Sequence, residues 1–333
     1  MRIYSNIIAV IFILYSSVLY SQNCETINRQ DRIYFEEIAG EMDYIYGKHF
    51  ENPSDYWNYV RSENKSLQKY ENKKNSGLKR KVIEQVSDYK MKDEIADRYR
   101  PDNPYDNENI DSLLVYIKRR VLGGDTFPNR VMLIDNDYIN ALTNANGNFY
   151  IMGGLYDILT NPEELIFVLA HEYTHYILKH IEQDIYQGKK TRRRNNIIGG
   201  IAGGLAVAGT TYMASQSRYM DAEITVNVNN QILESTDNMI DAYTLYSGYR
   251  YSRKQEFEAD YMAFNFMKLF GDTSFAISTL EKIYVATGMI SDKTEKEDDH
   301  PSLLERIKFM KFLETWDGEH TEKEKNDDLY YIP

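Results

Sequence analysis

The sequence predicts an α+β fold that is mainly helical, with a small β-sheet at the edge of one large domain. Two observations predict it. Apolar residues recur at helical spacing in most segments, above all in "NPEELIFVLAHEYTHYILKHIEQDIY" (161–186), whereas strand-like apolar runs occur at residues 130–152. The composition, with 42% hydrophobic and 27% charged residues, is that of a globular protein.

The first 21 residues have the layout of a secretory signal peptide. Arg2 gives a positive start, an apolar run follows, and Ser21 is suited to be the last residue before cleavage. An uncleaved membrane anchor is the alternative, because Leu19 is larger than the residue usual at its position. The single cysteine, Cys24, excludes an internal disulfide. We therefore expect an extracytoplasmic protein, periplasmic or secreted, and the net charge of −12 disfavours a nucleic-acid partner.

The next elements follow from spacing and from turn residues. Residues 22–105 are polar and rich in tyrosine, with apolar residues at helical spacing, and we predict an N-terminal helical arm. A main domain then spans residues 106–316. Its first helix is "ENIDSLLVYIKRRVLGG", closed by Gly123 and Gly124. "RVMLIDND" predicts a strand, and "INALTNANGNFYIMGGLYDIL" predicts two more strands joined by a turn at "NANGN".

The long helix at 161–186 carries strong start signals. Asn161 is suited to the N-cap and Pro162 to the first helical position, and two glutamates follow at the positive end of the helix. Further helices are predicted at 254–270, 274–287 and 302–315, and residues 317–333 are predicted to form a polar C-terminal tail.

The motif "HEYTH" within the long helix is typical of a metal site. His171 and His175 are four residues apart, so both imidazoles lie on one helix face and can reach one ion. Glu172 is rotated by about 100° and can instead act as general base towards a metal-bound water. His180 lies nine positions after His171 and is predicted to face the opposite side of the helix.

Two histidines require a further protein ligand, and "YSRKQEFEAD" is the best source. Glu256 and Asp260 are four residues apart and share a face, so Glu256 can bind the metal while Asp260 hydrogen-bonds a liganding imidazole. Glu258 is predicted to point elsewhere. The alternatives are a solvated acidic helix face and a metal-free structural protein with chance histidines.

These motifs resemble the zinc metalloproteases related to HtpX and BepA, which also include the type 1 CAAX prenyl protease and the mitochondrial Oma proteases. "HEYTH" is followed by "EFEAD" and then by "DHPSLLERI", in the order of the family motifs, and the resemblance covers about 108–315. It implies a gluzincin-type domain that holds one Zn²⁺ per chain. It implies zinc ligands at His171, His175 and Glu256, a base at Glu172, and supporting roles for Asp260 and Arg306.

The resemblance implies two further site features. His300, before Pro301, would lie near the zinc, where it could stabilise an oxyanion or occupy the fourth coordination position at rest. The strand around residues 148–152 would pair with an extended peptide substrate by strand addition. Its residues are Asn148, Phe149, Tyr150, Ile151 and Met152.

The glycine-rich, uncharged stretch at 197–214 could be taken for a membrane-spanning helix. It lies between His175 and Glu256, which must bind the same ion, and a single crossing would place them on opposite sides of a membrane. We predict instead a segment packed beside the cleft, acting as a lid or contacting the membrane surface with the help of the basic residues at 189–194. A buried connector is the alternative.

The sequence thus predicts a zinc-dependent endopeptidase that acts on unfolded or misassembled proteins in envelope quality control. The alternative is a latent protease that works mainly as a chaperone or assembly factor for envelope proteins. Peptide specificity and oligomeric state do not follow from these residues.

Overall fold

A computed structural model describes most of the predicted domain. It describes residues 27–72, 108–123, 130–135, 137–143, 147–187, 252–287 and 301–329, with single helical positions between 77 and 82 and with side chains up to residue 316 in the last range. Within these ranges the chain is mostly helical and contains one three-stranded sheet. The predicted α+β, mainly α fold is confirmed.

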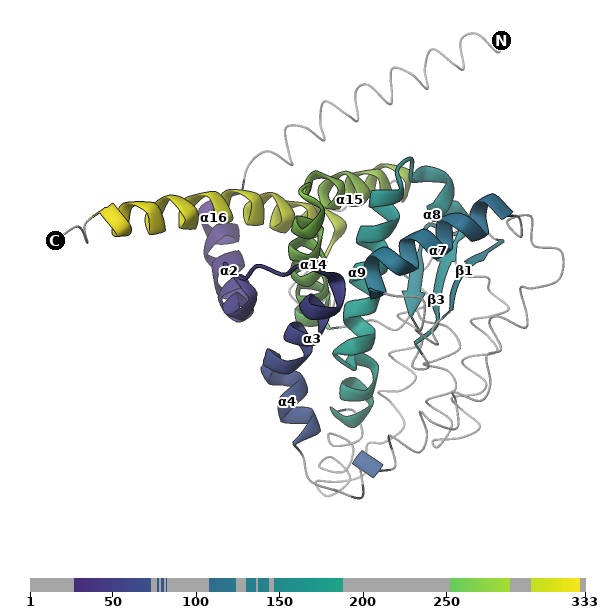
Figure 1. The fold of residues 1–333 in the computed structure, drawn as a ribbon, viewed down its shortest axis with the longest axis horizontal. Coiled ribbons are helices and arrows are strands. Elements are labelled where there is room, and N and C mark those ends of the chain that lie inside the picture. The colour runs from purple at the N-terminus through teal and green to yellow at the C-terminus, as the bar shows by residue number, and fades with distance from the viewer. Residues whose placement is uncertain are drawn as a thin grey trace, which may run out of the picture.

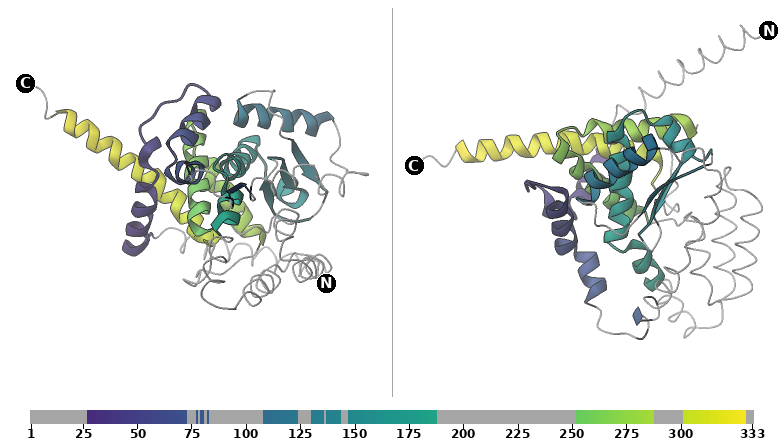
Figure 2. Two further views of the ribbon diagram at one scale, coloured as in Figure 1. Left: turned by 90° about the horizontal axis from the view of Figure 1, so that it is seen from below. Right: turned by 45° about the vertical axis from the view of Figure 1, so that its right-hand side comes forward.

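Two helices occupy the centre of the fold. Helix α9 (Pro162–Ile177) and helix α14 (Arg253–Met267) pack against each other along their lengths. The sheet lies on one side of this pair, and the N-terminal helices lie on the other (Figure 1, Figure 2). The apolar run before His171 is buried, as expected for a helix at the centre of a core.

The sheet has the strand order β1-β3-β2. Strand β1 (Val131–Ile134) pairs in parallel with β3 (Phe149–Met152), and β2 (Ala141–Thr143) pairs with β3 in the antiparallel direction. The three predicted strands are therefore present, but β3 is the central one. Its backbone pairs with a neighbour on each side, so the expectation that residues 148–152 accept a peptide by strand addition is wrong.

Further helices precede and follow the sheet in the chain. Helix α7 (Glu108–Leu122) ends where predicted, at Gly123 with φ +77°. Helix α8 (Gly153–Ile158) leads from β3 towards α9. The helices predicted at 254–270 and 274–287 are confirmed as α14 with the short η2 (Lys268–Phe270), and as α15 (Ser274–Thr287).

The last helix is longer than predicted. Helix α16 (Leu303–Leu329) continues through residues 317–329, which were expected to form a tail. The segment is rich in Glu and Lys, which are good helix formers, and its polarity alone does not end a helix. Figure 1 shows the last part of α16 extending beyond the other helices.

The N-terminal helices share the core of the main domain. They are α2 (Arg29–Gly40), η1 (Asp43–Ile45), α3 (Pro53–Glu63) and α4 (Lys65–Glu71). The Phe35 ring lies 5.4–6.1 Å from the rings of Phe257, Phe309 and Phe312. The Tyr56 hydroxyl donates a hydrogen bond to the backbone oxygen of Met262 at 2.5 Å. Residues before and after position 105 thus form one hydrophobic core.

Several predicted features lie outside the described residues. They include the signal peptide at 1–21, the glycine-rich stretch at 197–214 and His300. Among the helices that are described, none is long and apolar enough to cross a membrane.

The start of α9 is anchored by Glu164, which is buried. The carboxylate accepts hydrogen bonds from the backbone N–H groups of Thr160 and Asn161, at 2.9 and 3.3 Å, which completes the predicted N-terminal cap. It also pairs with Lys282 of α15 at 2.7 Å and accepts a hydrogen bond from Ser278 at 2.9 Å. Burial alone would raise the pKa of Glu164, but these partners hold it below its usual range.

Replacing Glu164 with glutamine should lower the free energy of unfolding at pH 7 by about 2 kcal/mol, because the charged hydrogen bonds to Lys282 are lost. The folded-state pKa lies below the unfolded one, so this stabilisation is present above the unfolded pKa and is lost as the pH falls through the folded pKa. Urea unfolding at neutral and acidic pH measures the difference. A difference between the two proteins that stays constant across this range would contradict the assignment.

Candidate metal centre

The two histidines of "HEYTH" come together on α9. His171 and His175 are both buried, and their Nε2 atoms lie 3.2 Å apart. The four-residue spacing places one ring above the other on a single helix face, as predicted. Both Nε2 atoms point towards α14.

Helix α14 supplies a carboxylate opposite these nitrogens. Glu256 Oε2 lies 3.6 Å from His171 Nε2, and Oε1 lies 3.9 Å from His175 Nε2. His171, His175 and Glu256 thus form a group whose possible ligand atoms all lie within 4.8 Å of one another. Within the described part of the chain, no other group of three His, Cys, Asp or Glu side chains does so. Tetrahedral bonds of about 2.05 Å would place donor atoms about 3.3 Å apart, so the three groups fit a zinc ion after small side-chain movements.

Asp260 and Arg306 support His171 on its Nδ1 side, away from Glu256. The Nδ1–H of His171 lies 2.9 Å from Asp260 Oδ1, and this hydrogen bond leaves the Nε2 lone pair free to face Glu256. Arg306 of α16 binds Asp260 with two hydrogen bonds of 2.7 and 2.8 Å, and its Nη1 lies 3.4 Å from Glu256 Oε2. Burial opposes ionisation of Asp260, but Arg306 and His171 keep its pKa below the usual range.

Glu172 lies beside the group without joining it. Its side chain is buried, and burial raises its pKa to about 7 although His171 and Arg306 favour the charged form. Thr143, at the end of β2, offers it a backbone hydrogen bond. Among the described residues, its Oε2 has no hydrogen-bond partner. A buried polar atom of this kind needs a hydrogen-bond partner, and water bound next to a metal would supply one.

His180 does not lie where helical geometry predicted. Helix α9 ends at Ile177, and Lys179 adopts φ +55°, so the 100° rotation per residue does not continue to position 180. The turn brings His180 back against His175, with 2.9 Å between their Nδ1 atoms. His180 is not one of the candidate ligands, but the prediction that it faces away is wrong.

Glu258 points away from the candidate metal position, as predicted, and towards the back of His180. Its Oε2 lies 3.3 Å from His180 Nε2, and its Oε1 accepts a 2.6 Å hydrogen bond from the side-chain amide of Asn64. Burial raises the pKa of Glu258, but His180 and Asn64 outweigh it and leave the pKa lowered. Sequence reasoning missed Asn64, because an asparagine in a polar helical segment gives no signal of a distant partner.

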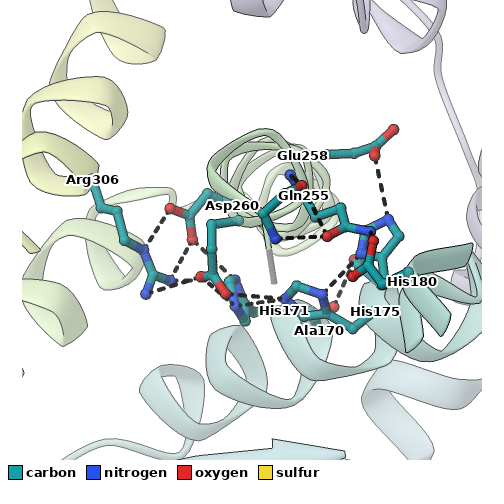
Figure 3. A network of polar contacts seen from close by, with 12 residues as sticks. Ala170, His171, His175, His180, Gln255, Glu258, Asp260 and Arg306 are labelled. Atoms are coloured by element: carbon teal, nitrogen blue, oxygen red, sulfur yellow. Dashed lines mark hydrogen bonds and ion pairs between the residues drawn. The ribbon is translucent and has the colours of Figure 1, made fainter. Parts of the chain in front are cut away.

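Figure 3 shows how these side chains are arranged. Arg306 with Asp260 lies at one end of the network, and His180 with Glu258 lies at the other. His171 and His175 lie between them, so each imidazole has its own polar support on the side away from Glu256.

Comparison with known protein families identifies the family of this chain. Residues 119–314, more than half of the chain, match the model of peptidase family M48. The chain belongs to peptidase family M48. The resemblance to HtpX- and BepA-like proteins is thereby confirmed. Enzymes of this family are zinc-dependent metallopeptidases, and the donor set of His171, His175 and Glu256 suits zinc. No curated protein matches the chain significantly.

The M48 match does not cover the whole folded core. Helices α2 and α3 precede residue 119, and yet they pack against α14, the helix that carries Glu256. The part of the molecule around the M48 site therefore includes residues from outside the matched segment.

Proposed function

We propose that this M48 metalloprotease is a zinc-dependent endopeptidase that cleaves unfolded or misassembled proteins in the cell envelope. One observation carries the proposal. His171, His175 and Glu256 form a buried group whose ligand atoms converge, and next to it lies a buried carboxylate, Glu172, with an oxygen that has no hydrogen-bond partner within the described residues. The layout of residues 1–21 as a signal peptide supports the extracytoplasmic location.

Each side chain of the site has its own role in peptide-bond hydrolysis. Zinc held by His171, His175 and Glu256 would supply Lewis acidity, which makes water at the site more acidic and polarises the scissile carbonyl. Glu172 accepts a proton on Oε2 from the water that attacks the carbonyl carbon. It then gives that proton to the leaving amine nitrogen as the C–N bond breaks. Asp260, fixed by Arg306, keeps the proton of His171 on Nδ1.

Two measurements test the proposal: the metal content of the protein and its cleavage of an unfolded test protein. The purified full chain should contain about one zinc per chain and should cleave a chemically unfolded protein in preference to its folded form. Replacing Glu256 with glutamine should reduce both the zinc content and the cleavage, because a neutral amide is a poor zinc ligand. Glu163→Gln makes the same chemical change at the start of α9, away from the group, and should alter neither.

Three other results would change the proposal. A protein that binds no zinc would exclude the metalloprotease mechanism. A zinc-loaded protein that cleaves no unfolded substrate, but prevents its aggregation, would favour the chaperone alternative. Recovery of the protein in the cytoplasm with residues 1–21 intact would exclude the role in the envelope.

A further inference from the structure

His175 has a polar partner on the side away from Glu256. Its Nδ1 lies 2.9 Å from His180 Nδ1, and the two rings meet edge to face with centroids 4.9 Å apart. Both side chains are almost fully buried, at 1% relative exposure for each residue. Two ring nitrogens at this distance require one to donate a proton and the other to accept it.

The direction of this hydrogen bond follows from the metal site. His175 must keep the lone pair of Nε2 for the metal, so its proton lies on Nδ1 and is donated to His180. His180 then accepts on Nδ1 and carries its own proton on Nε2, which faces Glu258 Oε2 at 3.3 Å. The carboxylate thereby selects the tautomer of His180, and His180 selects the tautomer of His175.

Asn64 completes this chain of contacts from the N-terminal helices. Asn64 is only 2% exposed and lies at the junction between α3 and α4. Its Oδ1 accepts the backbone N–H of Leu67 at 2.8 Å, which caps α4 and fixes the orientation of the amide. The amide nitrogen is therefore directed at Glu258 Oε1, 2.6 Å away.

We infer that His180, Glu258 and Asn64 are positioning residues that orient His175 for metal binding, so that helices α3 and α4 form part of the metal centre. The inference rests on the zinc site proposed above. It extends that site to a segment that precedes the M48 match at residues 119–314. His171 is held by Asp260 and Arg306, and His175 is held by this second, separate set.

Zinc affinity of the full chain, measured by competition with a chelator, tests the inference without an activity assay. His180→Ala should weaken zinc binding roughly 10- to 100-fold while one zinc per chain is still bound at saturation, because the support of a ligand is lost and not the ligand itself. His180→Asn should recover most of the affinity, since its amide oxygen can accept the Nδ1–H of His175. With Co²⁺ in place of zinc, the visible absorption should shift in His180→Ala and return towards the wild type in His180→Asn.

Asn64→Ser separates positioning from helix capping. Serine caps a helix about as well as asparagine but is too short to reach Glu258. We expect weaker zinc binding, by up to about 10-fold. The matched control is Asn52→Ser, because Asn52 caps α3 in the same way, through the N–H of Asp55, but is exposed and remote from Glu258. This control should leave zinc affinity unchanged.

Circular dichroism and thermal unfolding identify the variants that fold. Unchanged zinc affinity and an unchanged Co²⁺ spectrum in folded His180→Ala or Asn64→Ser would overturn the inference. The same holds if His180→Asn binds zinc as weakly as His180→Ala, or if Asn52→Ser weakens binding as much as Asn64→Ser. If His180→Ala does not fold, His180→Asn and Asn64→Ser decide. A wild-type chain that binds no zinc would instead refute the proposed function.

Discussion

Replacing Glu172 with glutamine should reduce the rate of peptide-bond cleavage by roughly 10²- to 10⁴-fold, which is the usual contribution of a general base. Glutamine has nearly the same shape, but its amide cannot accept a proton from the attacking water. Glu172 is not one of the three candidate ligands, so the variant should still bind about one zinc per chain. Cleavage of an unfolded protein and metal analysis of the same sample provide the two measurements.

The thermal stability of the Glu172→Gln variant provides a second test of the role of Glu172. Glu172 is a buried carboxyl group with an oxygen that lacks a partner among the described residues, and burial of such a charge is unfavourable. The metal-free Glu172→Gln protein should therefore unfold at the same temperature as the wild type or at a higher one. Glu163→Gln should keep full activity. Cleavage at the wild-type rate by zinc-loaded Glu172→Gln would exclude Glu172 as the base.

Replacing Asp260 with asparagine should destabilise the metal-free protein by about 3–5 kcal/mol, because it removes one partner of a buried ion pair. Asp260 is fully buried, and Arg306 makes two short hydrogen bonds to it. Without this carboxylate, the guanidinium loses its two short hydrogen bonds, and its ion-pair contact with Glu256 is longer, at 3.4 Å. Urea unfolding in the presence of a chelator measures the loss.

A double-mutant cycle assigns this loss to the pair. Arg306→Met alone leaves Asp260 with His171 as its partner and should also be destabilising. The double variant should be more stable than the sum of the two single losses predicts, because neither charge is then left without the other. Additive losses would show that Asp260 and Arg306 do not act as a unit.

The sequence predicted those parts of the fold and site that depend on local rules. Helix α9 starts at Pro162 because Asn161, Pro162 and Glu164 satisfy the first turn, and each of these residues is recognisable in the sequence. The spacing of His171 and His175 fixes a shared helix face, and Glu256 and Asp260 share a face of α14 for the same reason.

Other parts depend on tertiary structure, which the sequence does not display. Lys179 has φ +55°, a conformation usually adopted by glycine or asparagine, so nothing in the sequence marks the end of α9 there. Strand β3 became central because β1 pairs with its other edge, a choice that strand patterns do not specify. The contact between Asn64 and Glu258 joins positions 194 residues apart.

The shared core also bears on when this chain can fold. The Tyr56 hydroxyl hydrogen-bonds to the backbone of Met262, 206 positions later, and Phe35 packs against Phe309 and Phe312 in the first half of α16. These apolar side chains have no native partners until α14 and α16 have been synthesised. Contacts of such long range slow folding and leave apolar surface exposed in the meantime. We therefore expect the enzyme to fold, and to acquire its metal, only after the chain is nearly complete, which leaves the unfinished polypeptide dependent on chaperones.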